Sequence, residues 1–510
     1  MLAMNEIELG DDFAAYNNLE TFMAYSCMTS ASEFLSVSFN SSDITGTTYQ
    51  PSEIVLQCKK VFKNIIAYDK FDFDGKKESM YALRPAFDTV ADMIGKGKKV
   101  PESLLGIFAQ NPEYSAQLDS LINAKDKVPF KIFDKKNAEK LFGKNLNISA
   151  SQLEKFNLCR FSYFCNYGLN VRERQRAEIN PMQYGTIVHY ILERFFGEYT
   201  KEEYLSLEED KFQKIVCAYL AEYAVKYFGE EQLESNSFTY RLKTILDNVM
   251  YLMKHIMEEL SQSEFFVADC ELKFGEDIPS YSIVLPDGHK IAVCGSVDRV
   301  DIMQRADITY LRIIDYKTGT KQFKLSDILY GINLQMLLYL HSIEASGGDK
   351  YGEIVPAGIL YMPATVPYIS SDSLKSIDKL PDELNKKLKM NGLLLKDTEI
   401  IHGMDKTDVA TYIPVKIKAG EPVSSTSLAT LAEFGKIFKK VDMLIAEMGK
   451  NIYNGNIEAK PLKGGHDSCE YCPYDSVCAY RQSNPITCFS VDNKTVIEEI
   501  TNEINGKEEE

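Results

Sequence analysis

The fold is decided by two stretches of sequence, GSVDR at 295–299 and IIDYK at 313–317. Both stand at the ends of predicted strands, and side chains alternate between the two faces of a strand. Asp315 and Lys317 therefore point to one face, and Asp298 on a paired strand can reach the same place. The pattern predicts two carboxylates and one ammonium at a single sheet edge.

These three side chains suit divalent-metal chemistry on a phosphodiester. Carboxylate oxygens are hard ligands for Mg²⁺ or Mn²⁺, and such an ion polarises the phosphodiester and lowers the pKa of a bound water. Lys317 is then placed to orient that water or to offset charge on the phosphate. The spacing alone leaves a plainer alternative open, a solvated strand end at 315–317 and a surface pair at 298–299, because Asp-x-Lys tripeptides are common.

The flanking sequence predicts helices first and then a change of period. Residues 185–260 have helical spacing, whereas the residues after 264 alternate as strands do. Strands are predicted at Phe265–Phe274, Tyr281–Leu285, Lys290–Met303 and Thr309–Tyr316. A helix is predicted at Ser326–Ile343, and the further strand candidates are Gly358–Met362 and Thr411–Ile417. This order is not a regular βαβ alternation. No Rossmann or P-loop glycine motif occurs, so no nucleotide site of those kinds is predicted.

Four other polar residues accompany the two Asp motifs. Gln335 and Tyr339 stand four apart on the next predicted helix and share one face. His189 lies on an earlier predicted helix, and Glu271 lies in a strand. Taken singly, each of these residues has an ordinary explanation. Gln335 and Tyr339 would be a polar helix surface and a buried Tyr, His189 a hydrogen-bonded histidine of the core or surface, and Glu271 a surface residue.

A cysteine cluster stands near the end of the sequence. Cys469-x2-Cys472-x5-Cys478 supplies three thiolates, and a tetrahedral metal site needs four. Cys159, within an aromatic segment, is the leading candidate for the fourth, and Cys165 is the alternative. Spacing does not separate a structural zinc site from a 4Fe–4S cluster.

Length, charge and composition set the limits. A chain of 510 residues with 45% hydrophobic and 26% charged residues is not wholly disordered. The net charge is −17, of which residues 1–58 carry −8 and residues 497–510 carry −5. The body between them carries only −4, so the acidic total does not exclude a groove for DNA. No signal peptide and no run of 18 apolar residues is present, so we expect no membrane span and a reducing cytoplasm.

Taken in order, the motifs resemble the C-terminal nuclease domain of the B subunits of bacterial AddAB helicase–nucleases. These belong to the RecB-like branch of the PD-(D/E)xK nucleases. The resemblance covers about residues 146–485, from the Cys159 segment through Gly185–His189 and the two Asp motifs to the last cysteines. It implies an α/β fold, the restriction-endonuclease-like mixed sheet flanked by helices, behind a helical N-terminal connector.

The resemblance also implies roles for individual residues. His189, Asp298 and Asp315 would be ligands of Mg²⁺ or Mn²⁺, with the carbonyl of Tyr316 as a further ligand. The catalytic set would be Asp298, Asp315, Lys317 as the catalytic lysine, and Gln335 and Tyr339, which contact substrate or support the site. A 4Fe–4S cluster would be held by Cys159, Cys469, Cys472 and Cys478.

The implied domains are a remnant of a second helicase-like domain at 1–50, a helical connector at 51–145, and a nuclease domain at 146–510 closed by the cysteines of 469–478. Thr29-Ser30 stands where the family usually has Thr-Arg, so we expect no ATPase or helicase activity from these residues. The implied function is a metal-dependent DNA exonuclease. It would act on a single strand fed by the helicase–nuclease A subunit, in double-strand-break repair and recombination. The alternatives are a cluster-stapled DNA-binding scaffold and a stand-alone RecB-like exonuclease.

Overall fold

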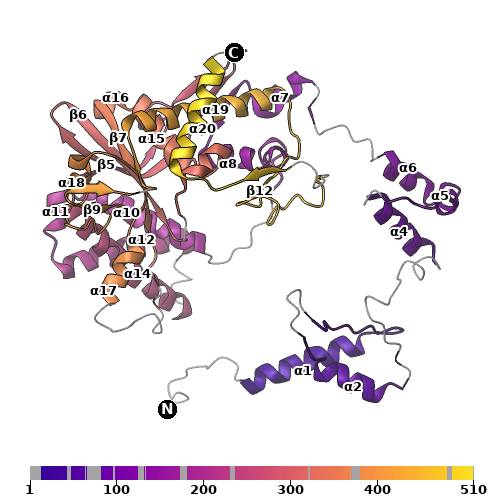
Figure 1. The fold of residues 1–510 in the computed structure, drawn as a ribbon. Coiled ribbons are helices and arrows are strands. Elements are labelled where there is room, and N and C mark those ends of the chain that lie inside the picture. The colour runs from indigo at the N-terminus through magenta and orange to yellow at the C-terminus, as the bar shows by residue number, and fades with distance from the viewer. Residues whose placement is uncertain are drawn as a thin grey trace. The chain divides into compact units, whose positions relative to one another are not determined.

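The structure is a computed structural model that forms two compact units, Met1–Lys127 and Val128–Glu510, hereafter the N-terminal and C-terminal units (Figure 1). It describes the following residues: 13–42, 48–63, 65, 82–95, 98–123, 131–132, 134–172, 181–229, 236–319, 322–367, 369, 380–424, 426–478, 480 and 485–508.

The described regular elements of the N-terminal unit are helices, together with an isolated bridge between Ser42 and Thr48. Its later helices pack around Phe87, Phe108 and Tyr114, whose rings form an edge-to-face and tilted cluster. Aromatic contacts of this kind give even a small helical cluster a core. The helices are α1 (Phe13–Thr29), α2 (Glu53–Val61), α4 (Leu83–Gly95), α5 (Glu102–Ala109) and α6 (Ser115–Asn123).

The C-terminal unit is built on a mixed six-stranded sheet in the order β11-β8-β7-β6-β5-β2. β2, β5 and β6 form an antiparallel meander, and β7 then pairs parallel to β6. This is the mixed sheet flanked by helices that the sequence predicts. The strands are β2 (Phe266–Lys273), β5 (Ser296–Arg305), β6 (Ile308–Lys317), β7 (Glu353–Pro363), β8 (Asn391–Leu395) and β11 (Leu428–Ala429).

Helices cover both faces of this sheet (Figure 1). On one side lie α10 (Pro181–Glu198), α12 (Glu209–Phe228) and α14 (Asn236–Ser261). On the other lie α15 (Gln335–Ser346), α19 (Leu431–Tyr453) and α20 (Asn493–Glu508). The short helical elements are α7 (Lys135–Phe142), α8 (Ala150–Leu158), α9 (Arg160–Tyr163), the π-helix η3 (Phe164–Gly168), α11 (Lys201–Leu205), the 3₁₀-helix η4 (Leu325–Tyr330), α16 (Gly348–Tyr351), α17 (Leu380–Leu388) and α18 (Thr398–Met404).

Three small sheets complete the unit. The first has the order β1-β4-β3, and β9 with β10 and β12 with β13 make two-stranded pairs. Their strands are β1 (Asn145–Ile148), β3 (Ser282–Val284), β4 (Lys290–Val293), β9 (Lys416–Lys418), β10 (Glu421–Val423), β12 (Leu462–Gly464) and β13 (Ile486–Cys488). Among the described helices, none combines the length and the apolar character needed to cross a membrane.

Three predicted elements differ from the structure. The strand expected over Lys290–Met303 breaks at Gly295, so that β4 and β5 belong to different sheets. Gly295 has a φ of +136°, a backbone conformation that ends a regular strand. The helix expected over Ser326–Ile343 is two elements, η4 and α15, separated by a turn in which Gly331 is left-handed. Of the strand expected over Thr411–Ile417, only the last two residues lie in β9.

Candidate active site

The strand register brings the three predicted carboxylate-bearing strands together. Arg299 pairs with Ile314 across β5 and β6, which sets Asp298 opposite Asp315. On the other side of β5, Cys270 pairs with Arg299 and Leu272 with Val297, which sets Glu271 of β2 opposite Asp298. Directly opposed residues of antiparallel strands have their Cβ atoms about 5 Å apart. Three carboxylates therefore form a row across adjacent strands.

Lys317 and Gln335 both contact the buried carboxylate of Asp315. The Nζ atom of Lys317 lies 2.6 Å from Oδ2 of Asp315, as strand alternation predicts. The amide nitrogen of Gln335, at the first turn of α15, donates to Oδ1 at 3.1 Å. Asp315 is 2% exposed, whereas Lys317 is partly exposed. The lysine can thus meet a solvent-borne substrate while the Asp is held from two sides.

A second group of ligand atoms gathers around His189 of α10. Its Nδ1 atom lies 3.1 Å from Oε1 of Glu271, and its Nε2 atom lies 3.6 Å from Oδ2 of Asp298. One ligand atom from each of these three residues falls within 4.8 Å of the others. Within the described part of the chain, no other group of three His, Cys, Asp or Glu residues meets that limit. Imidazole and carboxylate donors in this arrangement suit a divalent cation.

Glu271 is the site residue that sequence reasoning assigned to the surface. Its backbone is left-handed, with a φ of +50°, which is uncommon for a residue other than glycine. The hydroxyl of Ser296 donates to Oε2 of Glu271 at 2.9 Å and so fixes the second carboxylate oxygen. Strain of this kind persists where the surroundings enforce it, and it gathers at functional sites.

The electrostatics of the group reflect an excess of negative charge. Burial, followed by the neighbouring charge of Asp315, raises the pKa of Asp298 to about 7. The hydrogen bond from His189 holds the pKa of Glu271 below its usual range. Burial opposes the charged form of His189, but the hydrogen bond to Glu271 and the charge of Asp298 outweigh it and raise the pKa of the ring. A bound cation would relieve the repulsion between these carboxylates.

The two tyrosines of the predicted set are placed differently. The backbone N–H of Tyr316 donates to Oδ2 of Asp298 at 3.1 Å, while its phenol turns into the core beside Arg299. The hydroxyl of Tyr339 accepts a hydrogen bond from the backbone of Ala150, and its ring packs 5.2 Å from that of Phe274. Tyr339 therefore lies behind the carboxylates and supports the strands that carry them.

The predicted cysteines gather in a separate cluster. Cys159 and Cys165 are buried in one apolar cluster with Tyr474, and Cys472 and Cys478 pack against it. Cys469 adjoins them, since its carbonyl accepts the N–H of Cys472 at 3.3 Å and its charge acts on Cys478.

The donor chemistry of this cysteine cluster fits a soft metal centre. Burial raises the pKa of Cys159 and of Cys478, and the other thiols of the cluster add to that effect by repulsion. Thiolates in such surroundings require a cation, which a metal ion or an iron–sulfur cluster provides. The sulfur atoms do not all lie within 4.8 Å of one another. The hydroxyl of Tyr474 donates to the carbonyl of Val171 at 2.7 Å, which fastens the two cysteine segments together.

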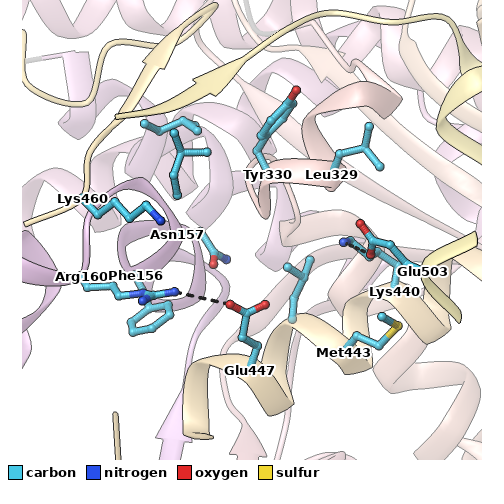
Figure 2. A pocket seen from close by; sticks show the side chains of 13 residues that line it. Phe156, Asn157, Arg160, Leu329, Tyr330, Lys440, Met443, Glu447, Lys460 and Glu503 are labelled. Carbon is cyan, nitrogen blue, oxygen red and sulfur yellow. Dashed lines mark hydrogen bonds and ion pairs between the residues drawn. The ribbon is translucent and has the colours of Figure 1, made fainter. Parts of the chain in front are cut away.

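A cavity of about 370 Å³ is lined neither by the carboxylate group nor by the cysteines. Figure 2 shows its charged walls: Arg160 pairs with Glu447, and the buried Lys440 pairs with Glu503 of α20. None of the predicted catalytic or metal-binding residues lines it. The charges of these two pairs are satisfied within the chain, so they add nothing to the chemistry of the site.

Comparison with known proteins gives one family and a consistent set of relatives. The PD-(D/E)XK nuclease superfamily matches this chain over residues 147–479. Proteins named as the B subunit of an ATP-dependent helicase/deoxyribonuclease are 31% identical in Thermoanaerobacter sp. (strain X514), covering 94% of this chain and 43% of the relative, and 32% identical in Clostridium botulinum (strain Loch Maree / Type A3), covering 93% and 43%. The protein of that name in Clostridium kluyveri (strain NBRC 12016) is 31% identical, covering 100% and 46%. The chain thus spans less than half the length of these relatives.

Proposed function

The chain belongs to the PD-(D/E)XK nuclease superfamily, and on that premise we propose that its C-terminal unit is a metal-dependent deoxyribonuclease. The observation that carries the proposal is the row of Glu271, Asp298 and Asp315 across three strands, with His189 and Lys317 against it. We infer that it acts as an exonuclease on a single strand that a helicase partner delivers. The names of the relatives, which join helicase and deoxyribonuclease, support that partnership.

The metal-binding residues in this proposal are His189, Glu271, Asp298 and Asp315, with the carbonyl of Tyr316 as a further ligand. Bound there, Mg²⁺ or Mn²⁺ would polarise the scissile phosphodiester and lower the pKa of a water molecule. The fit rests on hard carboxylate donors and on the pKa of Asp298, which burial and then the charge of Asp315 raise to about 7.

The chain's own residues supply the rest of the chemistry. Lys317, held by Asp315, is placed to orient the attacking water and to offset charge on the phosphate. Gln335 keeps one oxygen of Asp315 in place, and Ser296 keeps one oxygen of Glu271 in place. Side chains held in place in this way do not have to be reoriented during the reaction.

The proposal includes a 4Fe–4S cluster with a structural role, held by Cys159, Cys469, Cys472 and Cys478. It places the protein in a reducing cytoplasm. The support for the 4Fe–4S cluster is the packing of Cys159, Cys472 and Cys478 in one apolar cluster, next to which Cys469 lies. Protein purified without oxygen should be brown and contain about four irons per chain. Stoichiometric zinc without iron would instead make the centre a structural zinc site.

The nuclease assignment is tested by cleavage of end-labelled single-stranded DNA in Mg²⁺. We expect Lys317→Ala and Asp315→Asn each to lower the rate by about 100-fold or more, because each removes a charge that acts on the transition state. Lys418→Ala, at an exposed lysine of β9, is the matched control and should cleave as the wild type does. Full activity in both site variants would exclude the proposal. Salt-dependent DNA binding without cleavage by the wild type would favour the scaffold alternative.

A further inference from the structure

Two arginines and two acids form a fully buried charge network behind the candidate active site. Glu259 of α14, Arg299 and Asp301 of β5, and Arg312 of β6 are all between 0% and 1% exposed. Their formal charges sum to zero. Four charged side chains this deeply buried are unusual, because each loses its hydration.

The contacts within the network are short and multiple. Arg299 donates through Nε and Nη2 to the two carboxylate oxygens of Asp301, both at 2.7 Å. It reaches Glu259 at 3.0 Å as well. Arg312 donates to Asp301 at 3.0 Å and to Glu259 at 2.6 Å. The network therefore ties β5, β6 and α14 into one hydrogen-bonded group.

The network occupies the reverse face of the same two strands that carry the catalytic carboxylates. Arg299 directly follows Asp298, and Asp301 pairs with Arg312 across the strands. Arg299 also lies 3.4 Å from the hydroxyl of Tyr316, whose backbone N–H holds Asp298. Because side chains alternate between faces, the position of the network fixes the position of the site.

Stability alone does not explain such a network. Buried ion pairs can often be replaced by apolar residues without loss of stability. Glu259 is also near the C-terminal end of α14, where the helix dipole disfavours a negative charge. What the network does enforce is register. A slip of one residue between β5 and β6 would turn Asp298 away from Asp315 and leave buried arginines without their carboxylates.

We propose that Glu259, Arg299, Asp301 and Arg312 are positioning residues that hold Asp298 and Asp315 opposite each other for metal binding. The inference rests on the proposed function, which makes Asp298 and Asp315 metal ligands. That the network holds these two residues in place is inferred from the contacts described above. The network acts through the strands and touches neither metal nor DNA. Loss of the network should therefore disturb the geometry of the metal-binding residues while the protein remains folded.

The test replaces the whole network by apolar residues: Glu259→Leu, Arg299→Met, Asp301→Leu and Arg312→Met in one chain. We expect cooperative unfolding close to the wild-type temperature, but Mn²⁺ binding weaker by about 10- to 100-fold in calorimetry. Backbone hydrogen exchange of the β6 peptide, including the N–H of Tyr316, should be faster than in the wild type. Cleavage should be slower by about 100-fold, as for displaced catalytic groups.

The matched control is the double variant Lys440→Met/Glu503→Gln, which removes the ion pair between the buried Lys440 of α19 and the exposed Glu503 of α20 (Figure 2). It should leave Mn²⁺ affinity and the exchange of the β6 peptide unchanged. Wild-type Mn²⁺ affinity and exchange in the fourfold variant would overturn the proposal.

Arg312→Lys keeps the proposal testable if the fourfold variant does not fold. It retains the charge but loses the two-way bridge to Asp301 and Glu259, so its Mn²⁺ affinity should fall between the two extremes. Equal affinity and equal exchange in Arg312→Lys and wild type would overturn the proposal. A wild type that fails to cut DNA would refute the nuclease assignment alone, because metal binding and hydrogen exchange do not depend on cleavage.

Discussion

Replacement of Gly295 by alanine tests how the site is joined to its support. Gly295 lies between β4 and β5, and its carbonyl accepts the N–H of Phe274 at 3.0 Å. A Cβ atom at this position would lie 2.3 Å from the hydroxyl oxygen of Tyr339 and 3.0 Å from its Cζ atom. The φ of +136° is also one that side chains other than glycine rarely adopt. Alanine must therefore both strain the backbone and displace Tyr339.

The expected loss of stability follows from these two terms. The backbone conformation costs about 1–3 kcal/mol for a residue with a Cβ. Overpacking against Tyr339 costs about 1–3 kcal/mol more. Together they predict a loss of roughly 4 kcal/mol for Gly295→Ala, with lower cleavage because Ser296, the next residue, holds Glu271.

Two companion variants separate the terms. Gly288→Ala, in the β3–β4 hairpin, has a φ of +87° but no heavy atom within 4 Å of the added Cβ, so it should lose only about 1–2 kcal/mol. Tyr339→Phe in the Gly295→Ala background removes the nearest clashing atom and should recover about 1–2 kcal/mol. Thermal unfolding of the wild type, these variants and Tyr339→Phe alone, together with cleavage assays, measures these differences.

The reasoning is refuted by either of two results. In the first, the Gly295→Ala variant is no less stable than the Gly288→Ala variant. The contact with Tyr339 would then contribute nothing to the loss of stability. The second is a double variant that recovers no stability after the cost of Tyr339→Phe alone, which removes the acceptor of the Ala150 N–H, is subtracted; the strain would then lie elsewhere in the backbone.

Three further predictions concern the site and the cysteines. In metal-free protein, the pKa of Asp298 is about 7 in the folded chain and about 4 in the unfolded chain. The folded state therefore holds the extra proton, and the free energy of unfolding should fall as pH rises from about 4 to 7 and then level. An equal slope in Asp298→Asn, measured by thermal unfolding, would contradict this. Glu271→Gln should weaken Mn²⁺ binding by about 10- to 100-fold in calorimetry, whereas Glu276→Gln on the adjoining turn should not, and equal affinities would remove Glu271 from the ligand set. Cys159→Ala should lose bound iron or zinc by elemental analysis while Cys217→Ala keeps it, and full metal content in Cys159→Ala would exclude that ligand.

The meeting of Asp298, Asp315 and Lys317 could be predicted because it depends on local rules. Alternation along β6 places Asp315 and Lys317 on one face, and pairing of sequential strands places Asp298 beside them. Helical spacing likewise predicts that Gln335 and Tyr339 share one helix face, and in the structure the amide of Gln335 contacts Asp315. Each of these inferences needs only nearest neighbours in sequence or in the sheet.

The place of Glu271 could not be predicted in the same way. Its carboxylate reaches the site because β2 pairs with β5 and because its backbone is left-handed. Neither property can be read from the sequence, because glutamate has no preference for a positive φ. The break at Gly295 has the same origin: a glycine within a strand pattern signals a bulge or a close approach, but the partner that approaches, Tyr339, stands 44 positions later.

Arg299 shows how far the two faces of one strand can differ in what they require. As a surface partner of Asp298 it would be solvated, yet it is fully buried with Asp301 and Glu259, a residue 40 positions away. On that reverse face the formal charges of the two arginines and two acids cancel. On the catalytic face, three carboxylates meet one lysine and one histidine, and burial with Asp315 raises the pKa of Asp298 to about 7. The unbalanced face is the one that gains from a divalent cation, and the balanced face is the one suited to hold it in register.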